Sequence, residues 1–170
     1  MTNTSMISTI PDNGNFLQVS KFTFLIPGLS FARYFCQNVI MPGVSTSAPV
    51  QPTPFSEIYR PGDKLIYDPI TITFYLDEDM RTWEETYIWL ITLTQPFRFQ
   101  QYASRFTERS YDGVLETTKN SNLPNLRFKF HNLHPTSISS IQFDVTQTAD
   151  FTPTADITFQ FDTFEIERIT

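Results

Sequence analysis

The chain has 170 residues, the length of one domain, and it is 40% hydrophobic and 15% aromatic. This composition excludes intrinsic disorder and low-complexity or collagen-like classes, and the abundance of β-branched and aromatic residues, with 17 phenylalanines, favours strands. The net charge of −6 argues against affinity for nucleic-acid phosphates or anionic membranes, and no run of residues is apolar enough to span a bilayer.

The first residues, 1–15, are polar and lack the basic start and apolar stretch of a signal peptide. We expect them to form a flexible N-terminal arm of a single domain that spans residues 1–170. Apolar residues alternate over residues 21–26, and Pro27 and Gly28 follow, which predicts a strand and a turn. Residues 30–41 are predicted to return from that turn as the second strand of a hairpin.

Residues 42–61 have a different character, because they hold five of the 12 prolines. A central strand cannot lose that many N–H donors, so we predict a long extended arm that lies at an edge or protrudes. Its apolar residues are Val50, Phe55, Ile58 and Tyr59. Ordering about twenty residues costs on the order of 20 to 40 kcal/mol of backbone entropy, so the arm is expected to fold back on its own domain or to dock on a neighbouring subunit.

The clearest predicted strand covers residues 68–76, where apolar residues alternate with threonines. The spacing of the apolar residues then changes from that of a strand to that of a helix. A flanking helix is predicted over about residues 79–93, ending near 94–96. Its predicted apolar stripe consists of Met80, Trp83, Tyr87, Leu90 and Ile91. The acids Asp77, Glu78 and Asp79 precede it, and carboxylates at a helix N-terminus contribute about 1 to 2 kcal/mol through capping and the helix dipole.

Residues 97–125 show no regular pattern, although arginines and aromatic residues interleave over 97–109. Base stacking on single-stranded nucleic acid is one interpretation of that pattern, but the acids that follow favour interface or surface packing. Three strands are predicted after it, over residues 126–131, 138–145 and 155–166, the last with a bulge at Asp162-Thr163. The fold class is therefore mainly β, an antiparallel sandwich or barrel with one flanking helix.

The search for chemistry gives negative results. His131, His134 and Cys36 could offer at most three metal ligands, and the two histidines do not share a helix face. No nucleophile elbow or glycine-rich phosphate loop is present, and capping accounts for the acidic trio. We expect Cys36 to be a small buried apolar group, and we expect no catalysis, metal or cofactor.

The stretch from Tyr59 to Phe74 passes from a Gly-Asp pair through an alternating strand to Leu76, the acidic trio and the predicted helix. This arrangement resembles the tail tube family of contractile-tailed, T4-like bacteriophages. The end of the chain is similar to them as well, from Leu133 through Asp144 to a long alternating terminal strand. The resemblance covers most of residues 16–168.

The resemblance implies a structural protein whose hexameric rings stack into the inner tail tube, in contact with tail sheath and baseplate proteins. Such a protein is found in the virion and is assembled in the host cytoplasm, without a membrane partner. DNA passes through the lumen without specific binding. In this interpretation the arm joins subunits, and polar strand residues look into the lumen, namely Gln142, Asp144, Gln160 and Asp162.

Two alternatives stay open from the sequence. One is a paralogue at the baseplate that initiates the tube, because the Ser/Thr-rich N-terminal arm and the proline-rich arm depart from the family pattern. The other is a monomeric β-sandwich module that binds glycan or peptide and uses the aromatic residues of 97–111 as a platform. The oligomeric state separates this module from the ring-forming proteins.

Overall fold

The computed structural model describes residues 15–29, 32–94, 110–148 and 151–169. Within them the protein is mainly antiparallel β-structure with one long helix, so the predicted fold class is confirmed. The helices are α1 (Ala32–Phe35) and α2 (Arg81–Thr94). The strands are β1 (Phe22–Leu25), β2 (Cys36–Ile40), β3 (Val44–Thr46), β4 (Val50–Pro52), β5 (Glu57–Tyr59), β6 (Leu65–Tyr67), β7 (Ile70–Tyr75), β8 (Tyr111–Thr118), β9 (Pro124–Ile138), β10 (Thr154–Gln160) and β11 (Thr163–Arg168).

The long strand β9 connects two sheets. Its first part pairs with β8 on one side and β11 on the other, and β8 continues to β1. We call β1, β8, β9 and β11 the charged sheet. The end of β9, residues 134–138, pairs with β10, which continues through β7 to β2, and we call this four-stranded group the threonine sheet. Between the two parts of β9, Asn132 has a φ of 57°, a left-handed conformation that asparagine tolerates.

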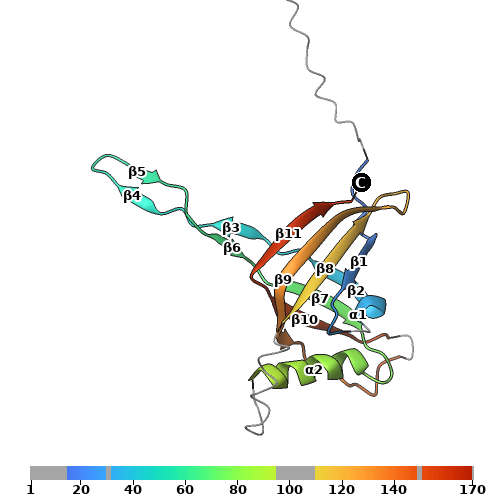
Figure 1. Ribbon diagram of the computed structural model, residues 1–170. Coiled ribbons are helices and arrows are strands. Elements are labelled where there is room, and N and C mark those ends of the chain that lie inside the picture. The colour runs from blue at the N-terminus through green and yellow to red at the C-terminus, as the bar shows by residue number, and fades with distance from the viewer. Residues whose placement is uncertain (1–14, 30–31, 95–109, 149–150, 170) are drawn as a thin grey trace, which may run out of the picture.

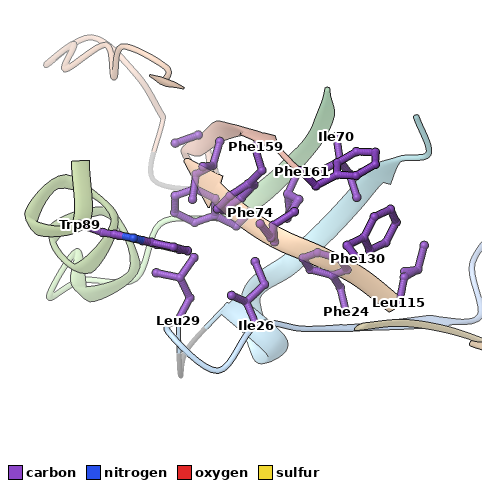
Figure 2. Close-up of a cluster of buried hydrophobic side chains, with 14 residues drawn as sticks. Phe24, Ile26, Leu29, Ile70, Phe74, Trp89, Leu115, Phe130, Phe159 and Phe161 are labelled. Carbon is purple, nitrogen blue, oxygen red and sulfur yellow. The ribbon is translucent and has the colours of Figure 1, made fainter. Parts of the chain in front are cut away.

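The core lies between the two sheets and is rich in phenylalanine. Phe24, Phe74, Phe130 and Phe159 are fully buried, and they come from both sheets (Figure 2). Helix α2 lies across one end of the strands (Figure 1), and Trp89 reaches from it to the core, with its ring centroid 6.0 Å from that of Phe159. The helix therefore closes an end that the two sheets alone would leave open to water.

The N-terminal half of the chain corrects two predictions. Residues 30–41 are not one strand, because α1 occupies 32–35 before β2 begins. The predicted hairpin is also wrong, since β1 pairs with β8 and β2 pairs with β7, in different sheets. The turn after β1 is present, closed by the Leu29 amide donating to the Ile26 carbonyl at 3.1 Å. The predicted strand at 68–76 is confirmed as β7.

The predicted helix over 79–93 is confirmed as α2, Arg81–Thr94, but its buried face is not the predicted stripe. The buried residues are Thr82, Thr86 and Trp89, one position out of phase with Trp83, Tyr87 and Leu90. At the N-terminus, the Asp77 carboxylate accepts a hydrogen bond from the Arg81 amide at 3.3 Å, in keeping with capping. Among the described residues, no helix has the length and apolarity to cross a bilayer.

The C-terminal strands differ from the prediction in extent. The strand predicted at 126–131 lies in the first part of the much longer β9, which continues through Pro135 to Ile138. The strand predicted over 138–145 is absent, because residues 139–148 form no strand or helix. The terminal strand predicted over 155–166 divides into β10 and β11, and the interruption at 161–162 is next to the predicted bulge.

Candidate assembly surfaces

The predicted arm is a self-paired hairpin that leads away from the body of the domain (Figure 1). Its base is a ribbon in which β3 pairs with β6, and its outer part is a ribbon in which β4 pairs with β5. The predicted range of 42–61 is thus only the first part of a hairpin that runs from Val44 to Tyr67. The arm pairs its own backbone, for example where the Arg60 amide donates to the Pro49 carbonyl at 3.0 Å.

The arm buries almost none of its apolar side chains. All four residues predicted from the sequence are exposed, and Phe55 at the tip is 99% accessible and Tyr59 68%. The sequence analysis missed Val44, Leu65 and Ile66, which are exposed on the base ribbon. An exposed apolar set of this size is typical of a surface that another protein covers.

At Gly62, between the two ribbons, the outgoing and returning segments of the arm come into close contact. A Cβ atom at this position would lie 2.1 Å from the Ser47 carbonyl oxygen, which no side chain permits. Nearby, the Thr46 hydroxyl donates to the Lys64 carbonyl at 3.1 Å. This close approach explains why position 62 is a glycine.

The outward face of the charged sheet carries a ladder of ion pairs. Arg127 Nη2 lies 2.6 Å from Glu116 Oε1, and Lys129 Nζ lies 2.9 Å from Glu167 Oε2. The hydrogen bond and charge of Glu116 raise the pKa of Arg127, and Lys129 lowers the pKa of Glu167. Beside the ladder is a shallow groove of about 260 Å³, lined in part by Leu25, Val114 and Arg33.

The outward face of the threonine sheet has a different chemistry. Its polar side chains include Thr71, Thr73, Asp156, Thr158 and Gln160. The Thr73 hydroxyl donates to Asp156 Oδ1 at 2.7 Å. Within β2, β7, β10 and residues 134–138 of β9, all of them described, there is no lysine or arginine.

The four residues predicted to face a lumen fall into two groups. Gln160 lies on the threonine sheet, and Asp162 follows it at the corner before β11, where Asn132 Nδ2 donates to its carboxylate at 2.5 Å. Gln142 and Asp144 lie in the irregular segment 139–148, so they are not strand residues. Asp144 accepts bonds from the amide and the hydroxyl of Thr146, at 2.9 and 2.7 Å, which lower its pKa.

The residues considered for chemistry are explained by packing. Cys36 was predicted to be buried but is half-buried, and this burial raises its pKa to about 11. His131 lies between Asp112 and Glu165 at 3.4 and 3.8 Å, and the described residues hold no cluster of three or more metal-ligating side chains. The proposed aromatic platform, residues 97–111, lies outside the described residues up to 109. Tyr111 is half-buried and packs against Trp89 in a T-shaped arrangement, with the ring centroids 5.1 Å apart.

Comparison with known proteins gives a consistent result. No family model matches the sequence. The chain is 22% identical over 162 residues to the tail tube terminator protein of Enterobacteria phage T4, covering 91% of this chain and 90% of that protein. The anti-feeding prophage tube-terminating cap superposes with a TM-score of 0.70 at 13% identity, over 97% of this chain and 99% of the other. A chain of the sheath–tube complex of an extracellular contractile injection system, PVC, gives 0.58 at 15% identity, over 99% and 100%.

The chain has the tail-tube-related fold of contractile injection systems. It is similar to proteins named for the tube and the tube terminator of contractile tails. The resemblance noted from the sequence is confirmed at this level, but the terminator was not among the alternatives considered there. The residues that carried the resemblance lie in the returning part of the arm, β7, α2, the end of β9 with the segment after it, and the terminal strands β10 and β11.

Proposed function

We propose that this protein is the tube terminator of a contractile phage tail, a ring of six identical copies that sits on the last ring of the tail tube and ends its growth. The observation that carries this proposal is the sequence similarity to the T4 tail tube terminator over about nine tenths of both chains. The higher TM-score with a tube-terminating cap, 0.70, than with the sheath–tube complex, 0.58, supports it.

In this proposal the arm joins neighbouring copies. Val50, Phe55, Ile58 and Tyr59 are exposed on a ribbon that already satisfies its own backbone, so a partner gains their apolar area without the entropy cost of ordering a loose loop. Burying one side chain of the size of Phe55 contributes about 1.5 to 3 kcal/mol, and a closed ring repeats the contact at every interface.

The partners of the ring follow from its position. It contacts the last tube ring on one side and the sheath on the outside, and the other side faces the head of the virion. The similarity to a PVC chain named for a sheath/tube terminator, with a TM-score of 0.58 and 14% identity, supports a place where tube and sheath end together. DNA passes through the ring without specific binding, and the ring is assembled in the host cytoplasm.

One observation favours a second candidate, the ring that initiates the tube at the baseplate. A chain of the anti-feeding prophage baseplate superposes with a TM-score of 0.61 at 7% identity, over 91% of this chain and 97% of the other. An initiator and a terminator share a fold but act on opposite ends of the tube.

An elongation assay separates the candidates. Purified tube subunits of the same tail are allowed to polymerise with and without a small molar fraction of this protein, and tube length is measured by negative-stain electron microscopy. A terminator gives shorter tubes with a distinct ring at one end. An initiator shortens the lag and leaves elongation unimpaired. Incorporation along the tube, or long tubes from this protein alone, would contradict both and support a tube subunit.

A further inference from the structure

The two sides of the charged sheet differ in charge. Its strands are ordered β1, β8, β9 and β11, so β1 and β11 lie on opposite sides of the sheet (Figure 1). Over β1, β8 and β9 lies the groove of about 260 Å³, whose lining holds three basic side chains, Arg33, Arg127 and Lys129, and one acid, Glu116. On the other side, β11 presents carboxylates. The two sides of one sheet are thus complementary in charge.

Arg33 is the basic residue of this groove that lacks an acidic partner. Its side chain is exposed on α1, and it forms no ion pair with the described residues. Arg127 and Lys129 are already paired with acids of their own copy. The rest of the lining includes the apolar side chains of Leu25, which is 39% accessible, and Val114. The groove therefore fits a carboxylate that arrives together with apolar area.

Strand β11 offers a carboxylate, apolar area and unpaired backbone at the opposite edge. The side chain of Glu165 is 71% accessible, and Ile166 beside it is 61% accessible. The Ile169 amide donates to the Asn125 carbonyl next to β9 at 2.9 Å. Because the direction alternates in an antiparallel ladder, the amides and carbonyls of Phe164 and Ile166 point away from β9. No described strand pairs with that edge, and β11 has neither a proline nor a register shift to protect it.

We propose that the β11 edge of one copy docks on the β1 side of the charged sheet of the next copy, with Glu165 of the first copy beside Arg33 of the second. The occupant of the groove is then a second copy of this chain. The inference rests on the proposed terminator ring. It adds a contact that is separate from the arm, and it names the two residues that meet there.

The register places the two residues at the same level of the sheet but on opposite sides. Glu165 lies opposite Lys129, Lys129 opposite Val114, and Val114 opposite Leu25, so these four residues form one row across the strands. Leu25 lines the groove together with Arg33. At the usual strand spacing the row is about 14 Å across, which is too far for Glu165 to reach Arg33 of its own copy. It reaches the level of Arg33 in a copy that continues the row.

The strand directions agree with this contact. The three pairings of the charged sheet are all antiparallel, so β1 and β11 run in opposite directions. Neighbours in a ring of six are related by a rotation of about 60°, which keeps the sense of every strand. The β11 edge of one copy therefore meets β1 of the next in the antiparallel sense, and the contact continues the pattern of the sheet from copy to copy.

Charge also selects which edges meet. Two β11 edges face to face would bring Glu165 and Glu167 of both copies together, and two β1 sides would bring two copies of Arg33 together. The head-to-tail arrangement places a carboxylate beside a cation, and head-to-tail contacts between two different surfaces are the kind that close into rings. An exposed ion pair adds little affinity alone, so its main effect is on the choice of partner surface.

A cross-link in assembled tails tests the contact directly. Arg33→Cys and Glu165→Cys are combined in one chain with Cys36→Ser, which removes the one native cysteine, and the tails are treated with a short bismaleimide. Denaturing gels are probed with an antibody against this protein, and we expect a ladder of covalent oligomers. The matched control combines Arg33→Cys and Cys36→Ser with Lys119→Cys, an exposed position between β8 and β9, and it should give monomers.

A charge swap tests the electrostatic part in the purified full-length chain. Arg33→Glu and Glu165→Arg each place like charges at the contact, so each should weaken ring formation by about ten-fold or more in sedimentation velocity. The double variant restores the opposite charges and should return to within about three-fold of the unmodified chain. Lys119→Glu, the control with the same change of charge as Arg33→Glu, should have an effect below about two-fold. Salt at about 0.5 M should reduce the losses of the single variants.

The two experiments separate this contact from the terminator function. A ring at one end of the tube that gives no cross-linked ladder would overturn the docking of β11 and leave the terminator function intact. Single charge variants that assemble as well as Lys119→Glu, or a double variant as weak as the two single losses combined, would also overturn it. Cross-linked copies that immunogold labelling finds along the whole tube would support the contact and contradict the terminator function.

Discussion

The core and the arm contain the same kinds of apolar side chain, but the core buries them and the arm exposes them to solvent. Phe159 in β10 is completely buried, whereas Phe55 at the tip of the arm is 99% accessible. Both lie on or beside strands whose backbone is paired, so hydrogen bonding does not separate them. The difference teaches that the body gains its stability within one chain, while the arm can gain apolar burial only from another protein.

The largest expected effect comes from emptying the core. Phe159→Ala removes a ring that contacts Trp89 and leaves a cavity between the two sheets, so we expect a loss of about 3 to 5 kcal/mol of unfolding free energy. Urea denaturation followed by tryptophan fluorescence measures it. A loss below about 1 kcal/mol would mean that this part of the body is not closely packed.

Substitution of Asn132, which lies between the two parts of β9, should have the next largest effect on the free energy of unfolding. Asn132→Val puts a β-branched residue at a φ of 57° and removes the bond to Asp162, so we expect a loss of about 2 kcal/mol or more. Asn132→Gly loses the same bond but permits the same φ, and it should cost less. The same denaturation experiment ranks the two variants, and equal losses would show that the left-handed conformation does not matter.

A substitution in the arm should affect assembly and leave the unfolding free energy almost unchanged, unlike a substitution in the core. Phe55→Ala removes a side chain that contacts water in the isolated chain, so its unfolding free energy should change by less than about 0.5 kcal/mol. Ring formation should weaken by about ten-fold or more per interface, as measured by sedimentation velocity. Phe16→Ala is the control, since Phe16 is 92% accessible but lies outside the arm. Equal effects of the two variants on assembly would remove the special role of the arm.

The smallest effect concerns Cys36 in β2. Its pKa is raised from 9.0 to about 11 by burial, so the thiol stays protonated at pH 8 and should react slowly with iodoacetamide in the folded protein. Because the folded pKa is the higher one, the stability from this group is full below pH 9 and is lost as pH rises toward 11. Alkylation in urea should be faster. Equal rates in both states would place Cys36 at an open surface.

The helix shows where sequence periodicity succeeds and fails. Its extent was predictable from the change of period and the acids before it, but its buried face was not. Hydrophobicity favoured Trp83, Tyr87 and Leu90, whereas the buried face is built on Thr82 and Thr86. The Thr86 hydroxyl donates to the Thr82 carbonyl at 2.8 Å, which satisfies it inside the helix and lets a polar residue face the core.

The pairing of the strands could not be predicted from the sequence, for a different reason. Alternation places a residue on a face but does not name the partner strand, and here β1 pairs with β8 nearly ninety residues later. Pro135 falls in the gap between the predicted strands 126–131 and 138–145, but it lies inside β9 at a register shift opposite Phe159, where the missing N–H is tolerated. The proline-rich composition revealed the arm, but the two contrasting faces appear only once the register is known.

The position of the protein in the assembled tail tests the central claim most directly. Cryo-EM of complete tails, with the density fitted by this fold, locates every copy along the axis. Our account predicts a single ring of six copies at the end of the tube nearest the head, with the arms reaching neighbouring copies. Copies repeated along the whole tube, or a ring only at the baseplate, would contradict it.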